Sequence, residues 1–350
     1  MRRFIIKSSY FVVPVLLLSI VVFLFNPQDQ GDLVRVGYIL QTSHNQEFSN
    51  PIKSVPMRMT YFSRQGQSVV DTFTYFTIGD SYSDKSNLGY NNFLANDSVS
   101  VLNLNRYYDQ NPVQSLINFI NSNAFDTLHV KYVILESAER YITYRGLKAD
   151  TSGVFTQKDI IKLRKSNLSK DGQDEKYDFF SERIFKVLYI NLLYNFMDNP
   201  PGSLTYKVRT RDTLFSAKTN ELLFINEDID YLNYNNSVDS VEKLNSRLNL
   251  LSQKLGTWGI KLIVLVCPDK YDLYYSSIKD KSNYVEPMFF EYLDDLQKDY
   301  LYVDTKSYLD SLKRKQKDLY YYGDTHWAPS TARAIAAEIN NTLLFKNNMP

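Results

Sequence analysis

The sequence is poor in the residues that disulfide frameworks and thiolate metal sites need. It has 350 residues but only one cysteine, Cys267, and three histidines. One cysteine excludes an intramolecular disulfide and any zinc or iron–sulfur site that needs several thiolates. A clear excess of positive charge is also lacking, since 40 lysines and arginines oppose 39 aspartates and glutamates. We therefore expect no nucleic-acid partner, because binding to phosphates usually requires a basic excess.

The chain is rich in residues that build a packed interior. Hydrophobic residues make up 44% of it, with 28 tyrosines and 21 phenylalanines, so it can bury a sizeable core. Because there are only three histidines, an imidazole base has to be His44, His129 or His326. We expect Cys267 to be a small buried side chain at the end of a strand and not a nucleophile.

The N-terminus has the pattern of an export signal. Basic residues within positions 1–7 precede a charge-free, mostly apolar run over residues 8–25, which as a helix would span roughly 27 Å. This pattern predicts a cytoplasmic basic tail and a transmembrane signal anchor, with the rest of the chain on the periplasmic or extracellular side of the cytoplasmic membrane. A cleaved signal peptide is the alternative, although no small-residue cleavage site follows.

The remaining chain divides into a short polar stretch and one long domain. Residues 26–66 are predicted to form a membrane-proximal stalk or an ornament on a sheet edge, with β-like stretches at 33–40 and 57–62. Residues 67–350 are predicted to form one α/β domain. Strands are expected at 72–78, 98–104, 130–135, 260–266 and 301–303, and helices at 113–122, 179–196, 241–255, 287–296 and 329–345, with an exposed loop at 150–175. This alternation predicts a three-layer α/β/α domain with a mostly parallel sheet.

One candidate nucleophile directly follows the clearest early strand. Gly79 permits a tight turn there, and Asp80 and Ser81 come next. Functional residues of parallel sheets gather where strands end, and backbone N–H groups in such a turn can face an oxyanion. The alternative is that Gly-Asp-Ser is an ordinary turn sequence.

One candidate base precedes the last predicted helix. Asp324 stands two residues before His326, so its carboxylate can orient one ring nitrogen while the other faces a nucleophile. His44 lies in the predicted stalk and His129 at the start of a strand, without such a partner. The alternative is a loop histidine in an ordinary hydrogen bond. Taken with Ser81, the pattern favours a Ser–His–Asp site.

Both motifs resemble a known superfamily. Residues 79–83 (Gly-Asp-Ser-Tyr-Ser) and 324–327 (Asp-Thr-His-Trp) resemble the signature segments of SGNH hydrolases, and within them the alginate O-acetyltransferase-like branch, which carries an Asp-x-His-Trp motif. Segments 133–140, 223–228 and 266–274 are similar to further stretches of that branch, and the resemblance covers about residues 69–145 and 215–345. In the branch the Asp-x-His-Trp segment comes before the serine segment. Here it comes after, so the two halves look circularly permuted.

The resemblance implies an SGNH-like fold and roles for individual residues. Ser81 would be the nucleophile, His326 its base and Asp324 the orienting carboxylate. The Ser81 amide would donate to the oxyanion, with Asn103 and Asn105 as further candidates. No metal and no cofactor are implied.

Other residues have less certain roles in this comparison. Gly79 belongs to the oxyanion or substrate region. Arg140 would position substrate, or else form a structural ion pair with Glu136 or Glu139. Lys270 and Tyr271 are outer candidates for an acceptor groove. Trp327 would support the histidine or stack on a sugar, and packing is the favoured expectation.

The function implied is an extracytoplasmic O-acetyltransferase. An acetyl group would pass through acyl-Ser81 onto hydroxyls of a polysaccharide. Because acetyl-CoA is cytoplasmic, a membrane-bound O-acyltransferase would supply the acetyl group, and the N-terminal helix would hold the domain beside it. An SGNH carbohydrate esterase with the same triad, and a non-catalytic polysaccharide-binding scaffold, are the alternatives.

Overall fold

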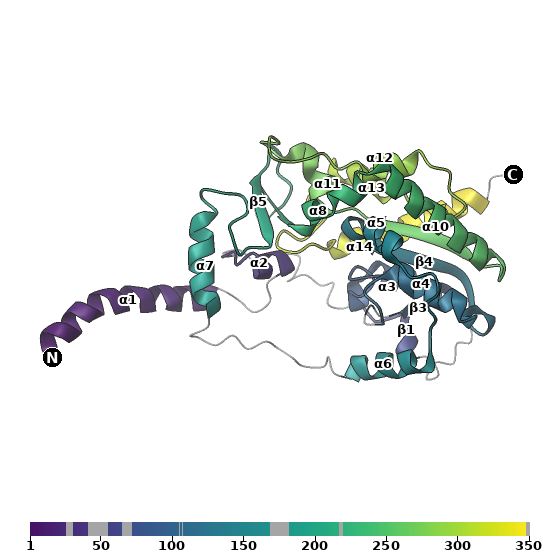
Figure 1. The fold of residues 1–350 in the computed structure, drawn as a ribbon, viewed down its shortest axis with the longest axis horizontal. Helices are drawn as coiled ribbons and strands as arrows, with labels where there is room; N and C mark the ends of the chain where they lie inside the picture. Colours follow the sequence, from purple (N-terminus) through teal and green to yellow (C-terminus); the bar gives the residue numbers. More distant parts are fainter. Residues whose placement is uncertain are drawn as a thin grey trace.

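A six-stranded parallel sheet forms the centre of the domain (Figure 1). The computed structural model describes residues 1–25, 31–40, 55–64, 72–104, 106, 108–168, 182–216 and 220–347. The strand order is β1 (Thr60–Tyr61), β3 (Val101–Leu104), β2 (Thr72–Ile78), β4 (His129–Ala138), β7 (Lys261–Cys267) and β8 (Leu301–Tyr302). Every neighbouring pair runs parallel. The predicted α/β class and mostly parallel sheet are therefore confirmed.

Alternating side chains of the central strands pack into two separate hydrophobic cores. Leu262 and Val264 of β7 belong to one core, with α4 (Pro112–Asn121) and α10 (Val238–Gly256). Ile263 of the same strand belongs to the other core. That second core includes side chains of α3 (Tyr90–Leu94), α13 (Thr305–Lys313) and α14 (Pro329–Asn347). The sheet is thus covered on both faces, which gives the predicted three layers.

A second, two-stranded sheet is separate from the six-stranded one. β5 (Thr205–Arg209) and β6 (Glu221–Ile225) form an antiparallel pair. The remaining helices are α2 (Asp32–Val36), α5 (Glu139–Lys148), α6 (Gln157–Leu168), α7 (Glu182–Leu193), α8 (Glu227–Asp230), α9 (Leu232–Asn235), α11 (Lys270–Tyr274) and α12 (Phe289–Asp294). Of these, α5 directly follows β4 and α8 directly follows β6, so both begin where strands end.

The prediction of an exposed loop over residues 150–175 was wrong in part. Its described portion contains the helix α6, and the side chain of Leu163 on this helix is 1% exposed. The sequence of α6 is mostly polar, so its hydrophobic residues give only a weak helical periodicity. Packing against the rest of the domain, and not this periodicity, stabilises the helix.

The residues expected to form a stalk are partly packed into the domain. Leu33 and Val34 of α2 are fully buried, and the Thr205 hydroxyl donates a hydrogen bond to the Leu33 carbonyl at 2.8 Å. The β-like stretch predicted at 33–40 is therefore helical at its start. The other part, β1, pairs with β3 at the edge of the sheet, as the edge-ornament alternative predicts.

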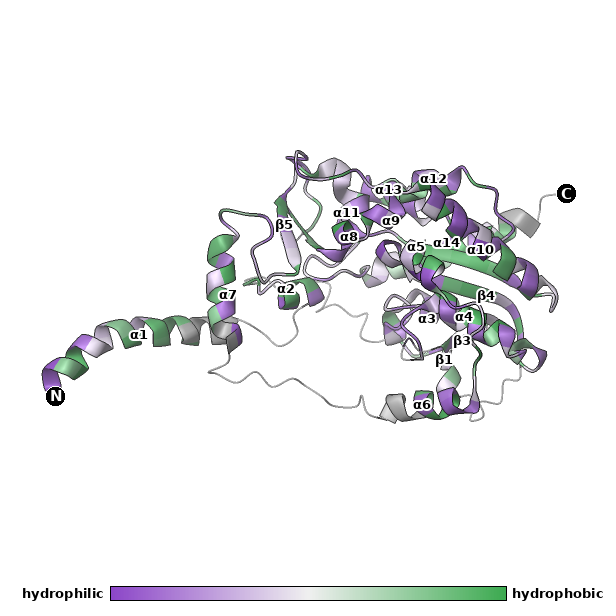
Figure 2. Cartoon of the chain, viewed as in Figure 1, coloured by the Kyte–Doolittle hydropathy of each residue, from purple (hydrophilic) through white to green (hydrophobic). Residues whose placement is uncertain are grey.

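The N-terminal helix α1 (Arg2–Phe25) extends away from the sheet (Figures 1 and 2). In the described part of the chain, no helix combines the length and the apolar character needed to cross a membrane. The transmembrane anchor predicted over residues 8–25 is therefore not supported by the described residues.

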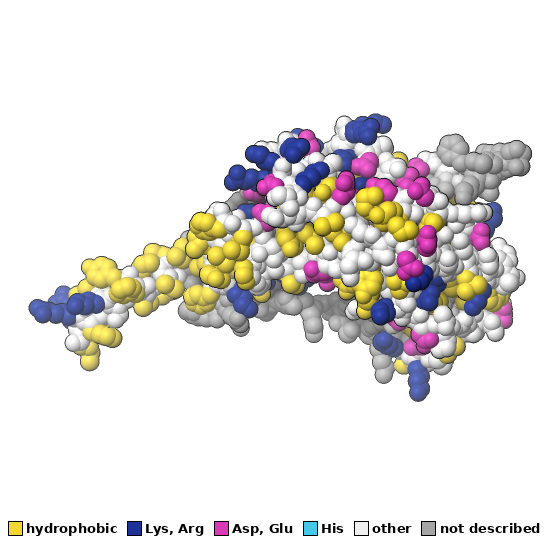
Figure 3. All heavy atoms as spheres, turned by 45° about the horizontal axis from the view of Figure 1, so that its top comes forward, with side chains coloured by type: hydrophobic (Ala, Val, Ile, Leu, Met, Phe, Trp, Pro, Cys, Tyr) yellow, Lys and Arg dark blue, Asp and Glu magenta, His cyan; other side chains and the backbone are white. Residues whose placement is uncertain are grey.

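Exposed apolar side chains lie on α1 and on the neighbouring α7. On α7 these are Phe185, Tyr189 and Leu192, each more than half exposed. Figure 3 shows hydrophobic side chains gathered along α1 and where it meets the body of the molecule. Among their described residues, neither helix contributes to the lining of the cavity described below.

Candidate active site

Ser81, His326 and Asp324 form a continuous chain of hydrogen bonds. Ser81 Oγ lies 2.7 Å from Nε2 of His326, and Nδ1 of His326 lies 2.5 Å from Oδ1 of Asp324. Ser81 follows β2 at its carboxyl end, whereas the other two residues lie in the loop before α14. Folding therefore joins the two motifs that the sequence separates by 245 positions. The geometry is that of a nucleophile, a base and an orienting carboxylate.

Asp324 has the charge state that an orienting carboxylate needs. Burial alone would raise its pKa, but the charge of His326 and hydrogen bonds from that residue hold the pKa of this carboxyl well below its usual range. The carboxylate therefore stays ionised and can stabilise a protonated imidazole ring.

The turn that carries Ser81 is held by the buried carboxyl group of Glu136 on β4. Its Oε2 accepts hydrogen bonds from the backbone N–H of Asp80 and of Ser83, both at 3.0 Å, and from the Ser83 hydroxyl at 2.7 Å. A Cβ at Gly79 would lie 2.1 Å from Ser83 Oγ and 2.3 Å from Oε2 of Glu136. Only glycine fits this close approach, so the role of Gly79 is steric.

Asp80 connects the same turn to α5. Its Oδ2 accepts from the backbone N–H of Ala138 at 3.0 Å and from Nη1 of Arg145 at 2.6 Å. Burial would raise the pKa of Asp80, but the Arg145 charge and these hydrogen bonds lower it well below its usual range. Asp80 is therefore an ionised structural group beside Ser81.

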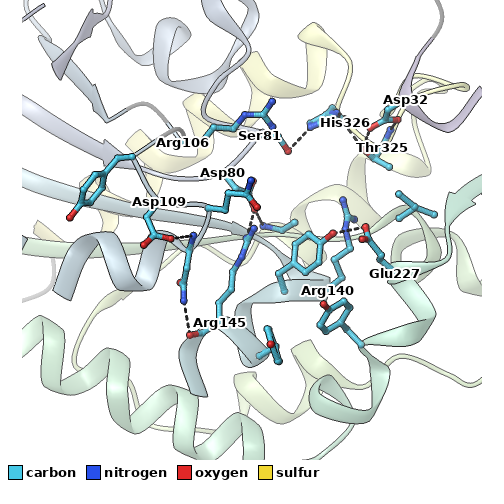
Figure 4. A pocket seen from close by; sticks show the side chains of 18 of the residues that line it. Asp32, Asp80, Ser81, Arg106, Asp109, Arg140, Arg145, Glu227, Thr325 and His326 are labelled. Carbon is cyan, nitrogen blue, oxygen red and sulfur yellow. Dashed lines mark hydrogen bonds and ion pairs between the residues drawn. The ribbon is translucent and has the colours of Figure 1, made fainter. Parts of the chain in front are cut away.

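A cavity of about 1000 Å³ opens in front of Ser81 and His326 (Figure 4). This volume is at the upper end of the range for ligand sites, roughly 300–1,000 Å³. Its far wall is charged and aromatic, and includes Arg140, Tyr141, Tyr144, Arg145, Glu227 and Tyr231. The cavity can therefore hold a substrate much larger than an acetyl ester.

The C-terminal part of the chain, which contributes Asp324 and His326 to this site, matches a known family. Residues 220–349 match the family model described as SGNH hydrolase-like domain, acetyltransferase AlgX. This stretch is similar to the AlgX family. The match confirms the resemblance to the acetyltransferase branch, and it contains Asp324 and His326. Ser81 lies before the AlgX match. No curated protein matches the chain.

Asp32 is a site residue that the sequence did not reveal. Its Oδ1 accepts from the Thr325 backbone N–H at 2.8 Å and its Oδ2 from the Thr325 hydroxyl at 2.5 Å. Its own N–H donates to Oδ2 of Asp324 at 3.4 Å, and its Oδ2 lies 3.8 Å from Nδ1 of His326. Asp32 thus fixes the loop of the AlgX-type stretch from the other end of the chain. No local pattern around it indicated this contact.

Asp32→Ala should slow catalysis without removing it. The backbone N–H and the hydroxyl of Thr325 would lose their acceptor, so His326 would be held less firmly. Loss of a group that orients catalytic residues typically costs about 10- to 100-fold, and we expect a fall of that size in kcat for p-nitrophenyl acetate. The matched control is Asp239→Ala on the exposed face of α10, which should leave kcat unchanged. Equal rates for the two variants would exclude this role.

Lys270 lies within the AlgX-type stretch and holds the same loop, which carries Asp324 and His326. Its Nζ donates to the carbonyls of Tyr321 (3.0 Å), Tyr322 (2.8 Å) and Asp324 (3.3 Å). Burial lowers the pKa of Lys270 to about 7, against the opposing charges of Asp32 and Asp324. The side chain therefore supports the loop that carries Asp324 and His326 and does not line the cavity. Its neighbour Tyr271 donates to the Val285 carbonyl.

Lys270→Met should change how stability depends on pH. The folded pKa is about 7 and the ordinary value 10.5, so between these pH values the unfolded chain binds more protons at this residue than the folded one. The free energy of unfolding from this group therefore rises with pH in that window. We expect the increase between pH 7 and 9.5, measured by urea denaturation, to be smaller in Lys270→Met than in the wild type. If the free energy of unfolding rose equally with pH in both proteins, this pH dependence would not come from Lys270.

The other predicted residues have structural positions. Asn103 is fully buried and donates to the Ser83 carbonyl at 3.3 Å, so its amide does not face the cavity. This corrects its proposed place in the oxyanion site. Asn105 and His44 lie outside the described residues. His129 is exposed at the start of β4. Trp327 packs against Tyr82 with ring centroids 4.8 Å apart, as expected.

Arg140 lines the cavity but is held by partners other than those expected. Its Nη1 lies 2.8 Å from Oδ1 of Asp228 and 2.5 Å from Oδ1 of Asp269. The expected partners act elsewhere, since Glu136 holds the serine turn and Glu139 accepts from the Asp269 N–H at 2.8 Å. Arg140 is therefore both a wall of the cavity and part of a buried ionic network.

Proposed function

We propose that this protein is an O-acetyltransferase that acts on a polysaccharide through an acetyl-Ser81 intermediate. The observation that supports this most strongly is the hydrogen-bonded chain Ser81–His326–Asp324 at the mouth of a large cavity. The AlgX-type match over residues 220–349 supports the transfer of acetyl groups.

The first half-reaction transfers the acetyl group to the enzyme. Ser81 Oγ attacks the acetyl carbonyl while Nε2 of His326 takes the hydroxyl proton. Asp324 stabilises the resulting imidazolium. In the part of the chain that the structure describes, no acceptor takes the Ser81 N–H, so this group is free to donate to the oxyanion. The donor oxygen then leaves with the proton from His326, which gives acetyl-Ser81.

The second half-reaction reverses these roles. A sugar hydroxyl enters the cavity, gives its proton to His326 and attacks the acetyl carbonyl. The oxyanion forms again at the Ser81 N–H, and its collapse releases the acetylated sugar while the proton returns to Ser81. The cavity would raise the effective concentration of the sugar hydroxyl over that of water.

We place this reaction outside the cytoplasm, in accord with the AlgX-type domain. Acetyl-CoA is not available there, so the acetyl group would reach Ser81 from another carrier. A membrane-bound O-acyltransferase is our candidate for this supply.

A carbohydrate esterase is the second candidate. The wall of the cavity carries charged side chains such as Arg145 and Glu227, which attract water. If water replaces the sugar hydroxyl in the second half-reaction, the same residues hydrolyse an acetyl ester.

The experiment that tests the proposal follows the acetyl group to its product. The full-length protein is incubated with p-nitrophenyl acetate and a series of bacterial polysaccharides, and glycan-bound acetate is quantified. We expect acetylated glycan with the wild type and none with Ser81→Ala. Acetate released only to water would favour the esterase. Glycan acetylation that is equal in Ser81→Ala would refute both functions.

A further inference from the structure

Three tyrosines form one face of the cavity opposite the nucleophile. Tyr141 and Tyr144 are three residues apart on α5, and Tyr231 lies between α8 and α9. The Tyr231 ring contacts both others, with centroids 5.2 Å from Tyr141 and 5.4 Å from Tyr144. All three are only half-buried, so their rings are accessible from the cavity. We call this group the tyrosine ledge.

The ledge is rigid and tied to the serine turn. The Arg145 guanidinium stacks on the Tyr141 ring at 4.5 Å from its centroid, and the same guanidinium bonds to Asp80, the residue before Ser81. The Tyr141 hydroxyl donates to Glu227. A fourth ring, Tyr234, supports Tyr144 from outside the cavity, at 5.2 Å. A ligand on the ledge would therefore lie at a fixed position relative to the nucleophile.

The charges on this wall select against anionic ligands. Arg145 is paired with Asp80, and Arg140 is paired with two carboxylates. Glu227 has no cation in an ion pair with it among the described residues. Figure 4 shows Arg140, Arg145 and Glu227 together on one side of the cavity, away from Ser81 and His326. Beside the ledge, a carboxylate on the ligand would meet two paired cations and the unpaired anion of Glu227. The other cations that line the cavity, Arg106 and Lys162, are held by Asp84 and by the Tyr108 carbonyl.

We propose that the tyrosine ledge is the acceptor subsite and that it binds uncharged pyranose units, not uronates. Tyrosine rings present an apolar face and a polar hydroxyl, which matches a pyranose with its C–H face and hydroxyl rim. Glu227 and the tyrosine hydroxyls supply the hydrogen-bond partners that fix its orientation. This inference rests on the proposed function for the identity of the acceptor, but the binding itself requires no catalysis.

Binding to a catalytically inactive chain tests the ledge. Ser81→Ala full-length protein is titrated by calorimetry with neutral tetrasaccharides of glucose, mannose and galactose, and with galacturonate and mannuronate tetramers. We expect at least one neutral tetramer to bind more tightly than either uronate. Adding Tyr231→Ala should weaken that binding about five- to tenfold, the range for loss of one aromatic contact. Tyr144→Leu gives a second, independent variant should Tyr231→Ala not fold.

The matched control is Tyr189→Ala on α7, a tyrosine that is 60% exposed and far from the cavity lining. It should leave binding unchanged. Tighter binding of a uronate, absence of binding by every tetramer, or unchanged affinity in both ledge variants would overturn the proposal. Because the assay uses Ser81→Ala, these outcomes are independent of whether Ser81 becomes acetylated, and a failure of acetylation alone would reject the proposed function and not the ledge.

Discussion

His326→Gln is expected to lower the rate of Ser81 acetylation by about 10³-fold. His326 is the group within hydrogen-bond distance of Ser81 Oγ that can take its proton, at 2.7 Å from Nε2. Glutamine can occupy similar space but cannot accept a proton at neutral pH. Removal of a general base costs roughly 10²- to 10⁴-fold, and loss of its coupling to the carboxylate places the effect toward the upper part of that range.

The measurement is the release of p-nitrophenol from p-nitrophenyl acetate by the full-length protein. His129→Gln is the matched control, because His129 is exposed at the start of β4 and away from the cavity. Wild-type rates are expected for this control. If His326→Gln retained more than a tenth of the wild-type rate, His326 would not be the base.

Asp324→Asn should reduce the same rate by about 10³- to 10⁴-fold. An amide at this position keeps the size of the side chain but loses the negative charge that stabilises the imidazolium. It also allows the amide group to donate toward Nδ1 of His326 and favour the wrong tautomer. Oδ1 of Asp324 lies only 2.5 Å from Nδ1 of His326, so the substitution directly disrupts this hydrogen bond.

Asp32 is expected to moderate this loss. Its carboxylate lies 3.8 Å from Nδ1 of His326, so it can supply part of the missing charge in Asp324→Asn. The double variant with Asp32→Asn should therefore fall further than the Asp324→Asn variant alone, and a double-mutant cycle on kcat measures this coupling. An Asp324→Asn variant with nearly wild-type kcat would remove Asp324 from the mechanism.

The central fold and the meeting of Ser81, His326 and Asp324 could be predicted because their signals are local. The run at 72–78 is rich in β-branched and aromatic residues and forms β2 with the same bounds, and the buried run at 260–266 corresponds closely to β7. Ser81 directly follows one of these strands, and Asp324 stands two residues from His326. The topology of a parallel sheet then brings strand ends together.

The rest of the site could not be predicted because its contacts connect distant parts of the chain. Asp32 and Thr325 are 293 positions apart, and Tyr141 and Glu227 are 86 apart. Neither pair has a motif or a periodicity that indicates the other member. Asn103 was misplaced for the related reason that an asparagine near the end of a strand can bond to backbone as readily as face a ligand.

The most direct test of the account is to locate the acetyl group on the protein. The full-length chain is mixed with p-nitrophenyl acetate, quenched in acid within seconds, digested and examined by peptide mass spectrometry. We predict one acetyl group on Ser81, absent in Ser81→Ala and strongly reduced in His326→Gln. Acetyl groups found only on other residues, with equal p-nitrophenol release from wild type and Ser81→Ala, would contradict a mechanism through acetyl-Ser81.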